Sequence, residues 1–299
     1  MLDVVIIGSG PAGITAAIYA KRANLNVAVV EKEYLGTGQI AESSRVDNYP
    51  GIPGIDGYSL GEKFREHAES LGVEFTEAQV LSLGQKDGIW IIGCDEDITL
   101  ESKAVIYATG CKNRPLGVPG EEKYYGRGLS FCAVCDGAFY KGKRVAVIGG
   151  GDTALDDAMY LSDICEKVYL VHRREFFRGS ASTLEKLKQK ENVEIIVNVR
   201  VYEITGDKKI DGIILDNKTK LNISGLFAAV GMIPQTELLK EFGVLDESNY
   251  VKASEDTKTT VNGLFAAGDV RTKQLRQVVT AAADGANAIY SVMEYLRNI

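Results

Sequence analysis

Two cysteines separated by two residues, Cys132 and Cys135, are the side chains of this chain best suited to redox chemistry. A Cys-x-x-Cys pair can hold a disulfide and open it again, and its thiolate is the nucleophile. Asp136 follows directly and can shuttle a proton beside a thiolate if burial raises its pKa. An aspartate here is also a common helix N-cap, and the two roles are compatible.

Zinc binding is the competing use of such a pair, because half of a zinc site has the same spacing. The chain has no second Cys-x-x-Cys, and the other cysteines and the histidines stand singly: Cys94, Cys111, Cys165, His67 and His172. We therefore expect no metal site. Five cysteines, an odd number, do not make a disulfide scaffold either.

The composition is that of an ordinary globular protein with room for two domains, since 45% of its 299 residues are hydrophobic and 25% charged. The net charge of −7 argues against a general surface for nucleic acid or anionic membrane. No apolar run approaches a membrane span, and the N-terminus resembles no signal peptide. We expect a cytoplasmic protein.

A first dinucleotide-binding unit is predicted at the N-terminus. Residues 3–8 are typical of a buried strand, residues 14–21 of a helix, and residues 26–30 of a second strand that ends at Glu31. The fingerprint Gly8-Ser9-Gly10-Pro11-Ala12-Gly13 allows a tight turn, close approach of a pyrophosphate, and packing of the helix on the strand. The free N–H groups of the helix start favour phosphate, and Glu31 can accept hydrogen bonds from a ribose.

A second unit of the same kind follows, with a strand at residues 144–148, a helix at 155–161 and a strand at 167–171. Its fingerprint, Gly149-Gly150-Gly151-Asp152-Thr153-Ala154, ends in alanine, which the pattern allows. The Cys pair lies between the two fingerprints. A chain that binds two dinucleotides and carries a disulfide between them is suited to moving electrons along that line.

The two units differ at the residue that meets the ribose. Glu31 stands 23 positions after Gly8, and the same step from Gly149 leads to a basic cluster: His172, Arg173, Arg174 and Arg178. A carboxylate suits a ribose 2′-hydroxyl, whereas arginines suit a 2′-phosphate. The second unit is therefore predicted to prefer NADPH to NADH.

Several other stretches are interpreted as parts of these two domains. Residues 60–71 predict an amphipathic helix, 73–107 and 193–215 small sheets, and roughly 274–295 a C-terminal helix. Gly263–Asp269 resembles a strand that delivers an acid to a nucleotide. Small residues near the start of the last helix suit close approach to a ligand: Ala281, Ala282, Ala283 and Gly285.

Together these motifs resemble those of the bacterial low-molecular-weight thioredoxin reductases over almost the whole chain. The resemblance is carried by the two fingerprints, the basic cluster, Cys132-Ala133-Val134-Cys135-Asp136-Gly137, Gly268-Asp269 and Arg276-Gln277-Val278. One departure is Gly36-Thr37-Gly38-Gln39, because many members have two adjacent glycines before the glutamine.

The resemblance implies an α/β fold with two Rossmann-like dinucleotide-binding domains, the NADPH domain being inserted into a discontinuous FAD domain. We expect the FAD-binding domain at residues 1–112 and 244–299 and the NADPH-binding domain, with the Cys pair, at 113–243. Residues 114–119, with two prolines and a glycine, read as the first linker. The chain is expected to return near residues 241–246.

Residue roles also follow from the resemblance. Cys135 would be the flavin-proximal thiol, Cys132 the thiol that attacks the partner disulfide, and Asp136 the proton donor and acceptor. The residues expected at FAD are Gly8, Ser9, Gly10, Pro11, Ala12, Gly13, Glu31, Lys32, Gly38, Gln39, Asn48, Ala108, Thr109, Gly110, Gly268, Asp269, Arg276, Gln277 and Val278. Those expected at NADPH are Gly149, Gly151, Asp152, Thr153, His172, Arg173, Arg174 and Arg178.

The implied reaction moves electrons from NADPH through FAD and the Cys132–Cys135 disulfide to thioredoxin or a thioredoxin-like protein. Relatives of this kind are homodimers. A flavin disulfide reductase fed by ferredoxin is an alternative, although it should lack an intact second fingerprint and the arginines. A redox-sensing nucleotide-binding protein without turnover is another. A ferredoxin–NADP reductase is disfavoured because it would not need the two cysteines.

Overall fold

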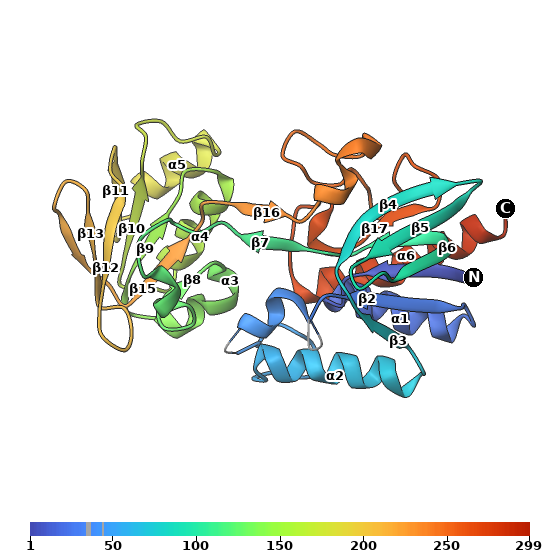
Figure 1. Ribbon diagram of the computed structural model, residues 1–299. Coiled ribbons are helices and arrows are strands. Elements are labelled where there is room, and N and C mark those ends of the chain that lie inside the picture. Colours follow the sequence, from blue (N-terminus) through green and yellow to red (C-terminus); the bar gives the residue numbers. More distant parts are fainter. Residues whose placement is uncertain (34–36, 44) are drawn as a thin grey trace. The chain divides into compact units, whose positions relative to one another are not determined.

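The computed structural model describes residues 1–33, 37–43 and 45–299, so Gly36 of the departing loop lies outside the described residues (Figure 1). The chain divides into two compact units. The first contains Met1–Lys112 and Ile233–Ile299, and the second contains Asn113–Met232. The chain passes between them through β7 (Cys111–Asn113) and β16 (Met232–Pro234), which pair as a two-stranded sheet.

The first unit is built on a sheet of seven strands, in which β3, β2, β1 and β6 run parallel and β17 pairs parallel with β6. The sequence of β1, LDVVII, is apolar almost throughout, as expected for a strand covered on both faces. The strands are β1 (Leu2–Ile7), β2 (Val27–Glu31), β3 (Glu74–Glu77), β4 (Val80–Lys86), β5 (Ile89–Cys94), β6 (Thr99–Tyr107) and β17 (Leu264–Ala266).

Two helices of the first unit, α1 and α6, pack closely on each other. A Cβ added to Gly285 of α6 would stand 2.2 Å from the Ala12 carbonyl oxygen, so only glycine permits this approach. We expected Gly285 to lie against a ligand, and the structure places it against α1 instead. The helices of this unit are α1 (Pro11–Arg22), α2 (Gly57–Ser70) and α6 (Val278–Leu296), with 3₁₀ turns η1 (Gly38–Glu42), η4 (Glu237–Phe242) and η5 (Gly268–Val270).

The second unit repeats the parallel pattern with five strands in the order β11-β10-β9-β15-β8, beside a three-stranded antiparallel sheet β12-β13-β14 (Figure 1). Its strands are β8 (Leu129–Ser130), β9 (Arg144–Ile148), β10 (Lys167–His172), β11 (Val193–Val197), β12 (Val201–Thr205), β13 (Gly212–Leu215), β14 (Lys220–Asn222) and β15 (Gly225–Ala228). Its helices are α3 (Ala133–Asp136), α4 (Asp152–Ser162) and α5 (Ala181–Lys188), with 3₁₀ turns η2 (Glu121–Tyr124) and η3 (Gly137–Tyr140).

The predicted α/β class with two Rossmann-like domains is confirmed, but the chain returns to the first unit earlier than expected. The boundary lies after Met232, not after residue 243. The intervening segment packs into the first unit: the Gln235 carbonyl accepts hydrogen bonds from Tyr107 Oη at 2.9 Å and Thr109 Oγ1 at 2.7 Å. Leu239 is fully buried in the same core cluster as Tyr107.

The two small sheets were only partly predicted. Over residues 73–107, β4 and β5 are antiparallel as expected, but β3 lies parallel to β2 and β6 is part of the main sheet. Over residues 193–215, β11 belongs to the parallel sheet, and the antiparallel sheet begins with β12. The helix predicted at 60–71 is α2, which Asp56 caps by accepting a hydrogen bond from the Ser59 amide at 2.9 Å.

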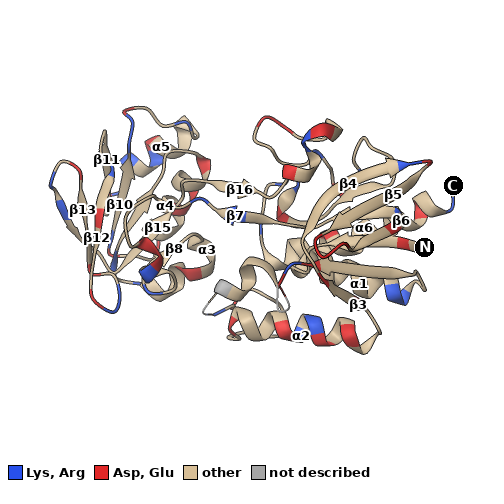
Figure 2. Cartoon of the chain, viewed as in Figure 1, with Lys and Arg blue, Asp and Glu red and all other residues tan. Residues whose placement is uncertain are grey.

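Charged side chains of both signs are interspersed over the elements of each unit (Figure 2). His67, on α2, is exposed, as expected for a surface residue. Within the described part of the chain, no helix is long and apolar enough to cross a membrane.

Candidate functional site

The first glycine fingerprint forms a turn that tolerates no side chain at two positions. Gly8 has φ +102°, and a Cβ there would stand 2.6 Å from the Ala108 carbonyl oxygen at the end of β6. A Cβ on Gly13 would stand 1.9 Å from the Gly8 carbonyl oxygen. The strand β1, the helix α1 and the end of β6 are therefore held together by backbone contact, as a dinucleotide turn requires.

Gly10, in contrast, has room for a side chain. The nearest atom to a Cβ built there is the Thr37 carbonyl oxygen at 3.8 Å, and Gly38, with φ +74°, lies beside it. Gly10 precedes α1, and Pro11 occupies the first turn of that helix, where its missing N–H costs nothing. The N–H groups of the first turn of a helix have no intrahelical partner and suit a phosphate.

Glu31, at the end of β2, ties the fingerprint to the strand beside it. Its Oε2 accepts hydrogen bonds from the Ser9 amide at 2.9 Å and from Ser9 Oγ at 3.1 Å, and its Oε1 accepts one from the Lys32 amide at 2.8 Å. A carboxylate can accept about four hydrogen bonds, so Glu31 retains capacity for a ribose hydroxyl.

Asp269 carries an unpaired acceptor. Its Oδ1 is buried and has no hydrogen-bond partner among the described residues. Burial raises the pKa of this carboxyl, while the cations of Lys273 and Arg276 oppose the shift. A buried acceptor without a hydrogen-bond partner is energetically costly. Asp269 is therefore suited to receive a donor from a bound molecule.

A buried charge network holds the segment that carries Asp269. Asp284 of α6 accepts two hydrogen bonds from Arg271, at 2.6 Å to Nη2 and 2.8 Å to Nε, and one from Lys273 Nζ at 2.9 Å. It also accepts the Gly268 amide at 2.9 Å. The three charged side chains are at most 7% exposed. Removing one member of such a network leaves an uncompensated buried charge.

The residues expected at a flavin ring gather at the start of α6. Gln277 is the N-cap of α6 and its Oε1 accepts a hydrogen bond from Asn48 Nδ2 at 2.8 Å. The guanidinium of Arg276 lies 4.3 Å from the centre of the Tyr250 ring. The hydrogen bond between Asn48 and Gln277 thus directly joins two segments that are 229 residues apart in sequence.

The remaining residues expected at FAD lie on the same elements. Val278 is the first residue of α6, and Ala12 packs against Gly268 of η5, where an added Cβ would stand 2.9 Å from the Ala12 Cβ. Gly38 and Gln39 begin η1, and Ala108, Thr109 and Gly110 follow β6 directly.

The Cys pair lies in the second unit as a disulfide between Cys132 and Cys135, with Cα atoms 5.3 Å apart. Cys132 is the N-cap of the short helix α3, and its Sγ accepts a hydrogen bond from the Cys135 amide at 3.2 Å. Both cysteines are half-buried, and Val134 between them is 52% exposed. Buried Ala133 anchors α3 in the core shared with Ala154 and Ala158 of α4.

Asp136 ends the same helix and does not act as an N-cap through its side chain. Its Oδ2 accepts a hydrogen bond from Ser130 Oγ at 2.6 Å, and Ser130 Oγ also accepts the Cys132 amide at 3.1 Å. Burial raises the pKa of Asp136, although the Ser130 bond acts against it. A carboxyl with a raised pKa beside the disulfide is suited to exchanging a proton. The sequence carries no signal for Ser130, because contacts across a strand–helix turn have no fixed spacing.

The loop between β10 and α5, residues 173–180, contacts the second fingerprint through hydrogen bonds. The Gly150 carbonyl accepts hydrogen bonds from the Arg178 amide at 2.7 Å and the Gly179 amide at 3.2 Å. Asp152 Oδ1 accepts the Ser180 amide at 2.7 Å. His172 lies so close to Gly150 that a Cβ there would stand 2.2 Å from its ring.

The loop therefore brings the predicted basic residues to the fingerprint. Arg173, Arg174 and Arg178 are exposed, while His172 is 7% exposed and its Nε2 lies 3.2 Å from the Phe176 carbonyl oxygen. Burial lowers the pKa of His172. The arginines are thus the exposed cations at this site, whereas the buried His172 packs against Gly150. Of the other predicted residues, Gly151 caps α4, and Asp152 and Thr153 begin it.

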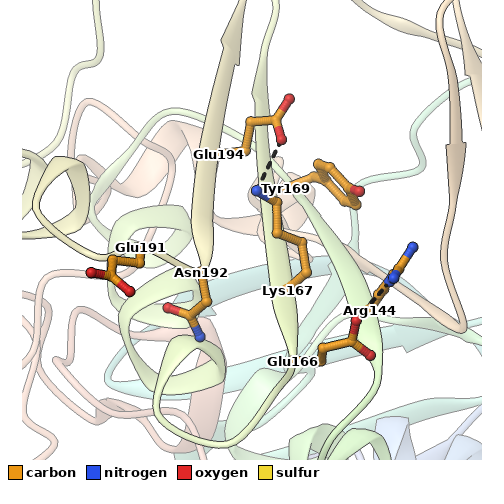
Figure 3. A pocket seen from close by; sticks show the side chains of 7 residues that line it. All are labelled: Arg144, Glu166, Lys167, Tyr169, Glu191, Asn192 and Glu194. Carbon is orange, nitrogen blue, oxygen red and sulfur yellow. Dashed lines mark hydrogen bonds and ion pairs between the residues drawn. The ribbon is translucent and has the colours of Figure 1, made fainter.

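A polar depression of about 430 Å³ lies elsewhere in the second unit (Figure 3). It is found at the amino ends of β9 and β10, whereas the fingerprint follows the carboxyl end of β9. Ligands of open parallel sheets bind at the carboxyl ends, so this depression is not the nucleotide site. Two ion pairs, Arg144–Glu166 and Lys167–Glu194, occupy it. The lining residues are Arg144, Glu166, Lys167, Tyr169, Glu191, Asn192 and Glu194.

The chain belongs to the pyridine nucleotide-disulphide oxidoreductase family, whose pattern matches residues 2–285. It is 38% identical over 305 residues to the thioredoxin reductase of Bacillus subtilis (strain 168), covering 99% of this chain and 95% of that protein. It is 39% identical over 303 residues to the "34.2 kDa protein in rubredoxin operon" of Clostridium pasteurianum, covering 99% and 97%.

The solved structure of thioredoxin reductase from Streptococcus pyogenes MGAS5005 is similar along the whole chain, with 40% identity and a TM-score of 0.93. The match covers 100% of this chain and 99% of that one. The resemblance to thioredoxin reductases is thereby confirmed. The protein is an oxidoreductase that acts on a disulfide, and its family implies a flavin and a pyridine nucleotide. The ferredoxin-fed and sensor alternatives are not favoured.

The first unit fits a bound flavin cofactor. It offers a backbone turn open at Gly10, a helix N-terminus, and an orphaned acceptor at Asp269. Among the described residues, no group of three His, Cys, Asp or Glu side chains could hold a metal ion.

Proposed function

We propose that the protein is a thioredoxin-disulfide reductase that holds FAD in its first unit and binds NADPH in its second. The observation that carries the proposal is the Cys132–Cys135 disulfide at α3. The same unit contains the second fingerprint and, in the loop bonded to it, three exposed arginines. Cysteines and arginines with this placement serve a reductase that draws electrons from NADPH.

FAD, when bound, supplies the two-electron chemistry that links nicotinamide to disulfide. The chain would hold it through the fingerprint N–H groups, Glu31 and the unpaired Oδ1 of Asp269. Arg276, Gln277 and Val278 would contact its ring. The Arg271–Asp284–Lys273 network fixes Gly268 and hence the position of Asp269.

The reduced Cys pair would then act by thiol–disulfide exchange. The Cys132 thiolate attacks one sulfur of the partner disulfide, which forms a mixed disulfide and releases one partner thiolate. The Cys135 thiolate attacks the Cys132 sulfur, which restores the Cys132–Cys135 disulfide and releases the second partner thiolate. Two protons complete the partner's dithiol, and Asp136 would supply one because burial raises its pKa.

The physiological acceptor would be thioredoxin or a thioredoxin-like protein, and the enzyme would work as a homodimer in the cytoplasm. Support for thioredoxin comes from the relatives that carry the name thioredoxin reductase. The intact second fingerprint and its arginines support NADPH as electron donor and argue against ferredoxin.

The test is an assay of the purified protein for NADPH oxidation with several thioredoxins, monitored by the absorbance of NADPH and by insulin reduction. We expect a yellow protein and steady turnover with NADPH and thioredoxin. A protein that stays colourless after addition of FAD would contradict the flavin assignment. Flavin reduction by ferredoxin but not by NADPH would favour the alternative donor.

A further inference from the structure

One aromatic side chain of the second unit is exposed beside the basic cluster. Phe176 is 77% exposed and lies in the loop that also carries Arg173, Arg174 and Arg178. A phenylalanine can bury about 150–250 Å² of surface, so exposing it leaves a large apolar face in water. The roles assigned to the fingerprints and to the basic cluster do not explain why a phenylalanine is exposed at this position.

The neighbouring Phe177 shows that Phe176 is not needed for the core. The Phe177 ring lies 4.8 Å from the His172 ring, centre to centre, and packs at the edge of the core that contains Leu155 and Leu170. The Phe176 carbonyl lies 3.2 Å from His172 Nε2, so its backbone is fixed while its side chain is exposed. Two residues later, the Arg178 amide is bonded to the fingerprint at Gly150.

We propose that Phe176 is the stacking surface for the adenine of the bound pyridine nucleotide. The inference rests on the proposed function, since it concerns the same nucleotide. Adenine and the 2′-phosphate are attached to adjacent ribose carbons. A loop whose arginines hold the phosphate therefore has its remaining side chains within reach of the base. Stacking of a base on an aromatic side chain needs an exposed ring on a fixed backbone, which Phe176 provides.

This role differs from that of the arginines in a measurable way. The arginines recognise the 2′-phosphate, which NADPH has and NADH lacks. Adenine is common to both, so Phe176 should contribute equally to both cofactors. Glu175 lies between the arginines and Phe176 and offsets one of the three positive charges, which leaves the loop cationic overall.

The experiment measures binding of adenosine 2′,5′-bisphosphate and of nicotinamide mononucleotide to the full-length protein by calorimetry. Phe176→Ala should weaken the bisphosphate about 5- to 150-fold and leave the mononucleotide, which has no adenine, unchanged. The Michaelis constants for NADPH and NADH should rise by the same factor. Phe176→Tyr keeps a ring and should restore binding. Tyr202→Ala is the matched control, since Tyr202 is 67% exposed on β12 and far in sequence from the loop.

Unchanged bisphosphate affinity in Phe176→Ala would overturn the proposal, as would a loss confined to 2′-phosphorylated ligands. A variant that binds nucleotides normally but has a raised Michaelis constant for thioredoxin would also overturn it and would assign Phe176 to protein docking. If the parent protein binds no adenine nucleotide, the proposed function itself fails. Circular dichroism of each variant excludes unfolding as the cause.

Discussion

The two dinucleotide units of this chain share one backbone plan, and three of the corresponding positions at which their residues differ are instructive. A step of 141 residues relates Gly8 to Gly149, Gly13 to Ala154, Ala16 to Asp157 and Glu31 to His172. In the first unit Gly13 has no room for a methyl group, whereas Ala154 carries one inside the core of the second. The strand and the helix that flank the fingerprint therefore approach each other more closely in the first unit than in the second.

The strand-end residue shows the larger chemical difference. Glu31 is bonded to the fingerprint itself, through Ser9, and presents an anion. His172 packs beneath Gly150, and the chain beyond it presents three exposed arginines. The same fold thus offers one acidic and one basic edge. In the function we propose, the acidic edge would meet an unphosphorylated ribose and the basic edge a 2′-phosphorylated ribose.

The largest expected effect removes the chemistry and leaves both units intact. Cys132→Ser and Cys135→Ser should each lower thioredoxin reduction by about a thousandfold or more, because exchange requires both sulfurs. Bleaching of the flavin by NADPH in stopped flow should remain, since both fingerprints lie outside the pair. Cys165→Ala, at a buried cysteine in the same unit, is the control and should turn over normally. Normal thioredoxin reduction by either serine variant would refute the role of the pair.

Exchanging glycine and alanine between Gly13 and Ala154, the last positions of the two fingerprints, tests this difference in packing. Gly13→Ala should lower the free energy of unfolding by about 3 kcal/mol and weaken flavin retention, because its Cβ would stand 1.9 Å from a carbonyl oxygen. Ala154→Gly should cost only about 0.5–1 kcal/mol, the usual penalty of glycine in a helix. Denaturant unfolding and flavin content measure both. Equal losses would show that the two turns are equivalent after all.

The basic edge is tested by Arg173→Ala combined with Arg174→Ala. A hydrogen bond to a charged group contributes about 1.5–3 kcal/mol, and solvent screening at these exposed side chains reduces that. The Michaelis constant for NADPH should rise about 10- to 100-fold and that for NADH about twofold or less. Steady-state kinetics with both cofactors decide the matter, and equal increases would count against the assignment.

The last prediction concerns stability alone and leaves the chemistry unchanged: Asp157 stands where the first unit has Ala16. Burial raises its pKa to about 7, and the nearby charge of Asp156 acts in the same direction. The unfolded pKa is about 3.9, so the folded state favours the protonated acid. Stability therefore falls as pH rises from about 4 to about 7, by roughly 4 kcal/mol at most, and is level above that.

Asp157→Asn should consequently raise the free energy of unfolding at pH 8 by about 2–4 kcal/mol and at pH 4 by less than about 1 kcal/mol. Urea unfolding at the two pH values is the measurement. Asp156→Asn, at the exposed neighbour, serves as control and should show little pH-dependent gain. A stabilisation independent of pH would mean that Asp157 is not protonated in the fold.

Local patterns were sufficient to predict both dinucleotide units. Glycine spacing and apolar runs located β1, α1, β2, β9, α4 and β10, because these signals depend on neighbours in sequence. The second domain boundary was misplaced by eleven residues, since the segment after Met232 has no break in composition. What holds that segment in the first unit is the contact of Gln235 with Tyr107 and Thr109, more than 120 residues away.

The sequence by itself determined the redox pair, the two fingerprints and the exchange of acid for base between them. Each is a matter of residue type at a fixed spacing. Tertiary structure alone decided that Asp136 is bonded to Ser130, that Asp269 keeps an unpaired oxygen, and that Gly285 lies against α1. These features depend on burial and on partners brought from other elements, and no local pattern encodes either.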